Sequence, residues 1–391
     1  MLLAFALAVC PLLQDPKPVA RDGNGADGWF TREQAQQCSA AADRGLRWLA
    51  AQQSDTGCWT GLVGHKQEDD YVLLDTGLPV DAQRRTGHGH LGVTALCGMA
   101  FLASGSLPDR GPHAAVVQKT LDYVNRQARE NGYLTDAGSR MYEHAFATLF
   151  LAEVYGMAAT EATKSTLERA VNLIVDCQNE YGGWRYNPFD RELDLSVTVC
   201  QVQALRAARN IGIRVPSGTI DKAMAYVTKS RVPSGSARGL FYYKLYGPRA
   251  PQKPTEYAIN AAALTALACA GVHDDDIAEP VLTFLARGYP QLADYYRTHF
   301  YYWYGNYYAA QAFYQYRRAA PARVLRPARR QPAAQPGARR PLAQRRRAGR
   351  RVRHRDGVHP AADAQAVPAD LPAVRRRAAA GAAAKSRRTR P

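Results

Sequence analysis

The stretch Gln178-Asn-Glu-Tyr-Gly-Gly-Trp-Arg-Tyr-Asn-Pro188 decides how this chain folds. Apolar residues at helical spacing lead into it over residues 165–177, and a second apolar helical pattern starts near Asp194. Gly182 and Gly183 separate the two patterns, because glycine enters left-handed and tight conformations at little cost. The stretch therefore predicts a unit of helix, Gln, Gly-Gly-Trp turn and second helix.

Weaker copies of this unit occur earlier in the chain. Residues 52–59 are Gln-Gln-Ser-Asp-Thr-Gly-Cys-Trp, and residues 126–133 are Arg-Gln-Ala-Arg-Glu-Asn-Gly-Tyr; both follow an apolar run. Gln and Gly keep their places, and an aromatic residue closes each turn. Self-similarity at a period of several tens of residues indicates a repeat protein. The positions expected to hold the repeats together are Gln53, Trp59, Gln127, Gln178, Gly182, Gly183 and Trp184.

The positive charge of the chain is confined to its C-terminal end. The 391 residues include 51 Lys and Arg against 34 Asp and Glu, a net charge of +17. From residue 317 onward there are 22 basic and 3 acidic residues, which leaves 29 basic and 31 acidic residues in 1–316, a net charge of −2. The part expected to fold is nearly neutral, so no nucleic-acid partner is indicated.

The first residues resemble an export signal. Residues 1–13 form an apolar run that is too short to span a bilayer and lacks a basic start. Residues 14–30 are polar, rich in Gly, Asp and Pro, and are expected to be a linker. We expect an exported protein, periplasmic or extracellular, with membrane association left open, and no transmembrane span.

The cysteines do not form a metal-binding pattern. Six lie beyond residue 13, none is in Cys-x-x-Cys spacing, and none has a nearby His. We therefore expect neither a metal nor a cofactor. A Cys38–Cys58 bridge would need an oxidising compartment and is the less favoured alternative.

Apolar periodicity predicts five helix pairs. They are 31–53 with 91–103, 113–128 with 141–155, 164–177 with 195–210, 219–229 with 256–270, and a fifth that begins at Ile277 and continues with 307–316. Residues 61–87 are expected to be an irregular loop and a candidate lid or rim. In each pair the first helix has a polar face and the second is apolar on nearly all sides, so the second must be buried. Amphipathic helices outside buried ones predict an all-α toroid of two concentric layers within residues 31–316. An open solenoid would leave both helices of a pair partly exposed.

Several motifs resemble those of the prenyltransferase/squalene oxidase repeat proteins, relatives of squalene–hopene cyclases and of protein prenyltransferase β subunits. They are the Gln-x-x-x-Gly-Gly-Trp turns, residues 142–153 (Tyr-Glu-His-Ala-Phe-Ala-Thr-Leu-Phe-Leu-Ala-Glu) and residues 299–308 (His-Phe-Tyr-Tyr-Trp-Tyr-Gly-Asn-Tyr-Tyr). The resemblance covers about residues 35–316. It implies an α/α toroid of six helix pairs, five of them visible here, and an isoprenoid in the central cavity.

The sequence changes character after Gln315. Residues 317–391 are rich in Arg, Ala and Pro without periodicity, as GC-rich coding DNA gives in a wrong frame. Suitable codons for residues 338–346, read one base later, give Leu-Asp-Gly-Pro-Trp-Leu-Asn-Asp, which resembles a repeat turn. The same shift can turn residues 326–338 into a helix that ends in Ser-Gln-Ala-Leu, and residues 350–372 into an apolar helix. We predict a frameshift near residues 315–320 that hides a sixth pair. The alternative is a genuine disordered basic tail that binds anionic surfaces.

The catalytic motifs of the resembling enzymes are missing. Class II terpene cyclases protonate an alkene with an Asp-x-Asp-Asp acid, which this chain lacks. Residues 274–276 are Asp-Asp-Asp between helices and are expected to cap one; residues 190–194 are nearer to the motif but do not match it. Protein prenyltransferases hold zinc with an Asp, a Cys close after it and a His. Asp176 and Cys177 are adjacent and have no evident His partner.

Polar residues at the starts of the buried helices remain as candidates, because in a toroid these starts face one end of the central cavity. The aromatic run 295–308 adds possible contacts to an apolar ligand. The candidate cavity or binding residues are Glu143, His144, Asp194, Ser196, Glu256, Tyr257, Asn260, Trp303 and Tyr307. The structural alternatives are helix caps for Asp194, Ser196 and Glu256, a satisfied core histidine for His144, and packing for the aromatic residues.

Two functional hypotheses follow from the sequence. The first is a cyclase- or prenyltransferase-like enzyme that acts on an isoprenoid in the central cavity, which the resemblance implies. The second is a non-catalytic exported scaffold or binding protein on the same fold, which the missing acid and zinc motifs favour. A cavity lined by aromatic residues beside a buried carboxylate would favour the first hypothesis, and a cavity filled by side chains the second.

Overall fold

The computed structural model describes most of the chain between residues 32 and 316. The described ranges are 32–60, 64–67, 70–73, 89–136, 140–247, 250–252, 254–294 and 301–316. The expected signal (1–13), the linker (14–30) and the basic tail (317–391) lie outside these ranges. The structural statements below concern the described residues.

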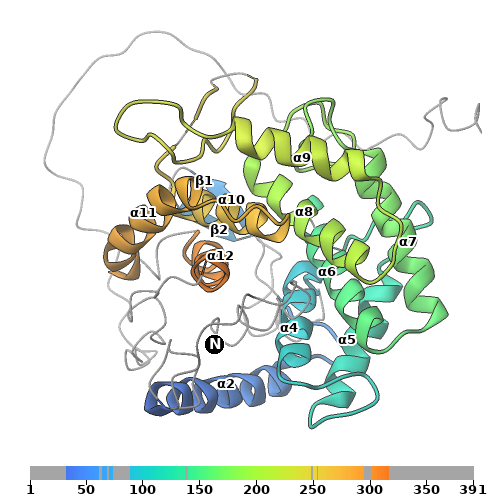
Figure 1. Cartoon of the computed structure of the whole chain (residues 1–391). Coiled ribbons are helices and arrows are strands. Elements are labelled where there is room, and N and C mark those ends of the chain that lie inside the picture. The colour runs from blue at the N-terminus through green and yellow to red at the C-terminus, as the bar shows by residue number, and fades with distance from the viewer. Residues whose placement is uncertain are drawn as a thin grey trace, which may run out of the picture. The chain divides into compact units, whose positions relative to one another are not determined.

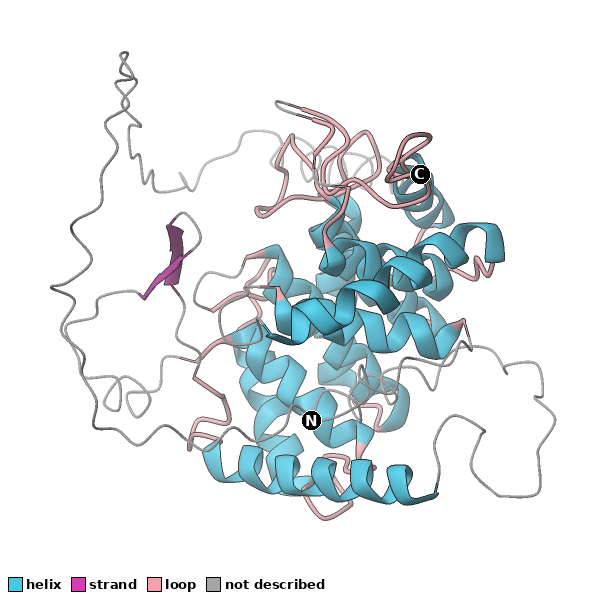
Figure 2. Ribbon diagram, turned by 90° about the vertical axis from the view of Figure 1, so that its left-hand side faces the viewer, coloured by secondary structure: helices cyan, strands magenta, loops and turns pink. Residues whose placement is uncertain are grey.

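The described residues form ten helices and one two-stranded antiparallel sheet. In chain order, they are α2 (Arg32–Gln52), β1 (Gly64–Gln67), β2 (Asp70–Leu73), α4 (Leu91–Ala103), α5 (Ala114–Arg126), α6 (Met141–Met157), α7 (Glu161–Asp176), α8 (Leu195–Asn210), α9 (Ser217–Lys229), α10 (Tyr257–Cys269), α11 (Asp275–Asp294) and α12 (Tyr302–Gln315). Helices dominate (Figure 2), which confirms the all-α class. No described helix combines the length and apolar character needed to cross a membrane.

The segment expected to be an irregular loop contains the two strands. β1 pairs antiparallel with β2, with Gly64 opposite Leu73. The Gly, Asp and Pro residues of 61–87 favour a loop, but Tyr71 and Val72 have aromatic and β-branched side chains that favour a strand.

Two kinds of helix alternate along the chain. α4, α6, α8 and α10 are buried over most of their residues, whereas α5, α7 and α9 bury one face. The buried helices pack in series, α4 on α6, α6 on α8, α8 on α10 and α10 on α12. α5, α7, α9 and α11 lie outside them (Figure 1). The alternation predicted from the apolar patterns is therefore confirmed.

Each repeat turn is tied to the start of the buried helix that follows it. Thr94, the fourth residue of α4, accepts at Oγ1 a hydrogen bond from the backbone N–H of Trp59 at 3.0 Å. Thr198, the fourth residue of α8, accepts one from the N–H of Trp184 at 3.1 Å. These bonds satisfy buried backbone donors that would otherwise cost free energy.

The repeated Gln and Gly join neighbouring pairs. The side-chain amide of Gln178 donates to the carbonyl of Gly182 at 2.9 Å in its own turn and to that of Thr219 at 2.8 Å on α9. Gly182 has φ +96°, and a Cβ there would lie 2.2 Å from the carbonyl oxygen of Lys222. Only glycine fits both the left-handed backbone and the close approach to α9.

The earlier turns repeat this arrangement. Gln53 donates to the carbonyls of Gly57 at 3.1 Å and Val116 at 3.0 Å, the second on α5. Gly132 in the second turn has φ +84°, and a Cβ there would lie 2.3 Å from the carbonyl oxygen of Arg169 on α7. In each case the turn of one pair rests on the outer helix of the next.

The indole of each repeat tryptophan donates a hydrogen bond to the outer helix of its own pair. The indole Nε1–H of Trp184 donates to the carbonyl of Ile174 at 2.8 Å, and that of Trp59 to the carbonyl of Leu49 at 2.9 Å. Both rings are buried. The hydrogen bonds explain why an aromatic donor closes these turns, since a buried indole needs a partner.

One helix start differs from expectation. α9 begins at Ser217 after Pro216, two residues before the predicted start at residue 219, and no side chain caps it. The cap expected from residues 274–276 is present, because Asp274 Oδ1 accepts a hydrogen bond from the N–H of Asp276 at 2.8 Å.

Candidate functional site

An apolar cavity of about 530 Å³ lies between α2, α4 and α12. α2 and α4 contribute mostly aliphatic and small side chains, such as Leu46, together with the carboxylate of Asp43. Four aromatic residues also line the cavity, Phe146 of α6 and Trp303, Tyr304 and Tyr307 of α12. The volume is in the range of small-molecule sites, which are mostly apolar with few polar groups.

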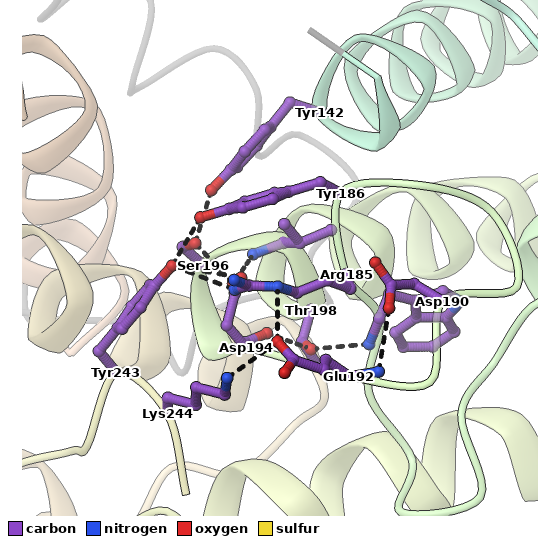
Figure 3. Close-up of polar contacts among 12 residues, drawn as sticks. Tyr142, Arg185, Tyr186, Asp190, Glu192, Asp194, Ser196, Thr198, Tyr243 and Lys244 are labelled. Atoms are coloured by element: carbon purple, nitrogen blue, oxygen red, sulfur yellow. Dashed lines mark hydrogen bonds and ion pairs between the residues drawn. The ribbon is translucent and has the colours of Figure 1, made fainter. Parts of the chain in front are cut away.

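A polar cluster surrounds the first turn of α8 (Figure 3). The carboxylate of Asp194 is fully buried and accepts hydrogen bonds at Oδ1 from the N–H of Val197 at 2.9 Å and from Ser196 Oγ at 2.7 Å. Its Oδ2 accepts from the guanidinium of Arg185 and from the hydroxyl of Tyr243 at 3.3 Å. Asp194 therefore caps α8, as the structural alternative expected, and also neutralises Arg185.

Further contacts extend the cluster. Arg185 lies over the ring of Tyr186, with Cζ 4.1 Å from the centroid. Lys244 Nζ is 2.9 Å from Glu192 Oε2, and Arg185 Nε is 3.6 Å from the same oxygen. With Asp194, two cationic and two anionic side chains compensate one another. A further carboxylate, that of Asp190, accepts a hydrogen bond from the N–H of Glu192 at 3.1 Å beside these four side chains.

Hydroxyl groups connect the polar cluster to the cavity. Tyr142 OH and Ser196 Oγ share a hydrogen bond at 2.6 Å, and Tyr304 OH donates to the carbonyl of Ser196 at 3.0 Å. Because Tyr304 also lines the cavity, its ring faces the apolar space while its hydroxyl is bound to α8. The first turn of α8 therefore positions an aromatic wall of the cavity.

Two predicted site residues have structural partners at every polar atom of their side chains. His144 Nδ1 accepts from the N–H of Leu134 at 3.1 Å, and Nε2 lies 3.2 Å from the carbonyl of Ala170. Burial lowers the pKa of His144 to about 4. Asn260, the fourth residue of α10, accepts from the N–H of Phe241 at 2.8 Å and donates to two carbonyls. Thr94 and Thr198 make equivalent contacts at the starts of α4 and α8. His144 and Asn260 therefore also hold a turn against the start of a buried helix.

Glu143 is the buried carboxylate nearest to the start of α6. It is 1% exposed, and its Oε1 accepts from Thr135 Oγ1 at 2.5 Å and from the N–H of Asp136 at 3.4 Å. Its negative charge raises the pKa of His90, but the larger effect of burial leaves that pKa below its ordinary value. These residues belong to α4, α6 and the turn before α6, and none of them lines the cavity.

The remaining predicted residues divide between packing and the cavity. Glu256 stands at the N-terminal boundary of α10 without a side-chain cap, so the expected capping role is not seen. Tyr257 is 8% exposed, and a Cβ on Gly305 would lie 3.0 Å from its ring, which places it in the α10–α12 contact. Trp303 and Tyr307 line the cavity, as expected for ligand contacts. Trp303 is 54% exposed.

The sequence interpretation did not single out Glu153 as a site residue. It is 7% exposed on α6, seven residues after Phe146 and therefore on nearly the same helix face. Burial raises its pKa to about 7, and its charge acts on Tyr307 of the cavity wall. A single acidic residue inside an otherwise apolar helix was the signal available in the sequence.

The described cysteines are free thiols, and no described group of His, Cys, Asp and Glu could hold a metal ion. Cys97 lines the cavity, and burial raises its pKa to about 12, which keeps it a neutral thiol. The Asp176–Cys177 pair forms no described metal site.

The sequence has no detected match among known families. No protein-family model matches the chain, and no curated protein is significantly similar to it.

Proposed function

We propose that this chain is an open α/α toroid of the squalene-cyclase and prenyltransferase type, and that it binds an isoprenoid or similar apolar molecule in the cavity between α2, α4 and α12. The observation that carries the proposal is the cavity of about 530 Å³ with aromatic residues from α6 and α12 in its lining. Binding there removes apolar ligand surface from water, worth about 25 cal/mol per Å².

Binding without catalysis is the better supported form of the function. Asp194, His144 and Asn260, three of the candidate polar residues, are engaged in hydrogen bonds that hold helix starts and turns. A side chain that makes these hydrogen bonds can contact a ligand only if the helix start or turn that it holds is broken. Export of the protein stays a prediction of the sequence, since residues 1–13 are outside the described part.

Conversion of the ligand is the second candidate, because Glu153 lies on nearly the same face of α6 as the cavity-lining Phe146, although Glu153 itself does not line the cavity. Its pKa of about 7 keeps part of the carboxyl groups protonated at neutral pH, as proton donation to an alkene requires. The aromatic faces of Phe146 and Tyr307 would stabilise a carbocation formed nearby.

Lipid extraction from protein purified out of an isoprenoid-producing host tests binding, with mass spectrometry as the readout. We expect an isoprenoid to copurify with the natural chain and to be lost from Ala100→Phe, which fills the cavity wall of α4. Ala51→Phe is the matched control, because Ala51 is exposed on α2 and does not line the cavity. Equal lipid content in all three proteins, or none in any, would contradict the proposal.

The same extracts test conversion. A product that accumulates with the natural chain and disappears with Glu153→Gln, while the ligand still copurifies, would establish it. Unchanged ligand in every extract would leave binding as the function and exclude conversion of that ligand.

A further inference from the structure

The cavity between α2, α4 and α12 has an acidic lining. Among the described residues that line it, Asp43 is the single charged one, and none is a lysine, an arginine or a histidine. Glu153, whose charge acts on the cavity-lining Tyr307, is acidic as well. A phosphate or carboxylate head group would therefore find no cation in this lining, whereas a positively charged head group would meet an opposite charge.

Asp43 lies toward one end of the cavity-lining face of α2. That face consists of residues 39, 42, 43, 46 and 49, which helical spacing places on one side of the helix. Its N-terminal part carries the polar Ser39 and Asp43, and its C-terminal part the apolar Leu46 and Leu49. The face is about 15 Å long, at roughly 1.5 Å per residue. One end of it suits a polar head group, and the other suits an apolar chain.

The carboxylate of Asp43 is available to a ligand. Asp43 is exposed, and it forms no hydrogen bond or ion pair with another described residue. The neighbouring cations of α2, Arg44 and Arg47, are exposed too and do not line the cavity. An ion pair at an exposed carboxylate strengthens binding only a few-fold, so the lining must add to it.

Aromatic rings supply that addition. Trp303 is 54% exposed and lines the same cavity as Asp43, together with Tyr304 and Tyr307. The hydroxyl of Tyr304 donates to the carbonyl of Ser196, so Tyr304 offers its ring to the cavity rather than its hydroxyl. Cations are attracted to the faces of aromatic rings, and to tryptophan most strongly. A carboxylate and aromatic rings in one cavity together favour an ammonium group.

We propose that the ligand of this cavity is a cationic amphiphile, an apolar chain with an ammonium head group, in which Asp43 binds the head group and the aliphatic residues of α2 and α4 contact the chain. This assignment rests on the binding proposed above and adds the chemical class of the ligand. It excludes prenyl diphosphates, because the lining offers their phosphates no cation. An uncharged alcohol with the same chain binds more weakly, through its chain alone.

Three ligands with one common chain test the assignment: farnesylamine, farnesol and farnesyl diphosphate. Each is titrated below its critical micelle concentration into the full-length protein at neutral pH and low salt, with Trp303 emission as the readout. We expect farnesylamine to bind at least about fivefold tighter than farnesol. Farnesyl diphosphate should bind at least about fivefold more weakly than farnesol. Added salt should weaken the binding of farnesylamine and leave that of farnesol unchanged.

Asp43→Asn tests the role of the carboxylate. It should reduce the preference for farnesylamine over farnesol to less than about twofold, with the affinity for farnesol unchanged. Asp55→Asn is the matched control, because Asp55 is exposed just beyond the end of α2 and does not line the cavity; it should keep the preference. Ala100→Phe identifies binding outside the cavity, such as that of the diphosphate to the 22 basic side chains of residues 317–391.

The outcomes separate this inference from the proposed function. Saturable binding of farnesol, with farnesylamine no tighter, overturns the inference and leaves the binding of an apolar ligand intact. A preference for farnesylamine that survives Asp43→Asn also overturns it, because another group would then bind the ammonium. Tightest binding of farnesyl diphosphate, lost in Ala100→Phe, overturns it as well. Unsaturable responses to all three ligands would overturn the proposed function and this inference together.

Discussion

Gly182 and Gly212 both have a left-handed backbone, with φ +96° and +88°, but only Gly182 touches another helix. A Cβ on Gly182 would lie 2.2 Å from the carbonyl oxygen of Lys222, whereas nothing lies within 4 Å of one on Gly212. We expect Gly212→Ala to lower the free energy of unfolding by about 1 kcal/mol, the cost of the backbone conformation. Gly182→Ala should cost at least about 3 kcal/mol, because α9 must also move. Urea denaturation measures both, and equal losses would show that the contact with α9 is absent.

Glu153 and His144 make opposite contributions to the pH dependence of stability. The folded-state pKa of Glu153 is raised from 4.5 to about 7, so its contribution to stability falls as pH rises through that window. The folded-state pKa of His144 is lowered from 6.5 to about 4, so its contribution falls as pH drops through that window. Each effect amounts to about 3 kcal/mol at most, at 1.36 kcal/mol per pKa unit.

Single substitutions should separate the two contributions. In the natural chain the two contributions largely offset one another between pH 4.5 and 6.5, so Glu153→Gln should turn a nearly flat profile into a stability that rises with pH because of His144. Chemical denaturation at several pH values measures this. A Glu153→Gln protein whose pH profile parallels that of the natural chain would mean that Glu153 is ionised and solvated in the folded state.

At the scale of an element, the repeat glutamines differ in what they bind. Gln178 donates to carbonyls in its own turn and on α9, whereas Gln127, at the end of α5, makes no corresponding side-chain hydrogen bond among the described residues. Gln178→Ala should therefore lower the free energy of unfolding by about 2 kcal/mol, and Gln127→Ala by less than about 0.5 kcal/mol. Thermal unfolding of the two variants measures the difference; equal losses would contradict the role of Gln178 in joining α7 to α9.

Helix positions were the part of the fold that the sequence predicted best. The bounds predicted for α4 and α8 are those of the structure, because both helices are apolar on nearly all sides and follow a Gly-rich turn or loop. The contacts of Arg185 with Asp194 and Glu192 were not predicted. They depend on how the loop after Trp184 folds back, and helical periodicity carries no information about that.

The candidate site was predicted only in part, for a related reason. Trp303 and Tyr307 line the cavity. The predicted residues at the helix starts do not: Asp194 caps α8, and His144 binds the turn before α6. A cap and a catalytic carboxylate have the same residue type at the same sequence position. Only the hydrogen bonds of Asp194 and His144 separate the two roles, and some of them join residues distant in sequence, such as Asp194 with Tyr243 and His144 with Ala170. The cavity itself arises between α2 and α12, the two ends of the described series.

At the scale of the whole molecule, the proposed binding requires that the space between α2, α4 and α12 accept an apolar molecule. Titration of the purified protein with farnesol, followed by Trp303 emission, measures this directly, because Trp303 lines the cavity. We predict saturable binding that shifts the emission to shorter wavelength, is lost in Ala100→Phe and is retained in Ala51→Phe. A linear, unsaturable response, or equal binding by Ala100→Phe, would contradict the account.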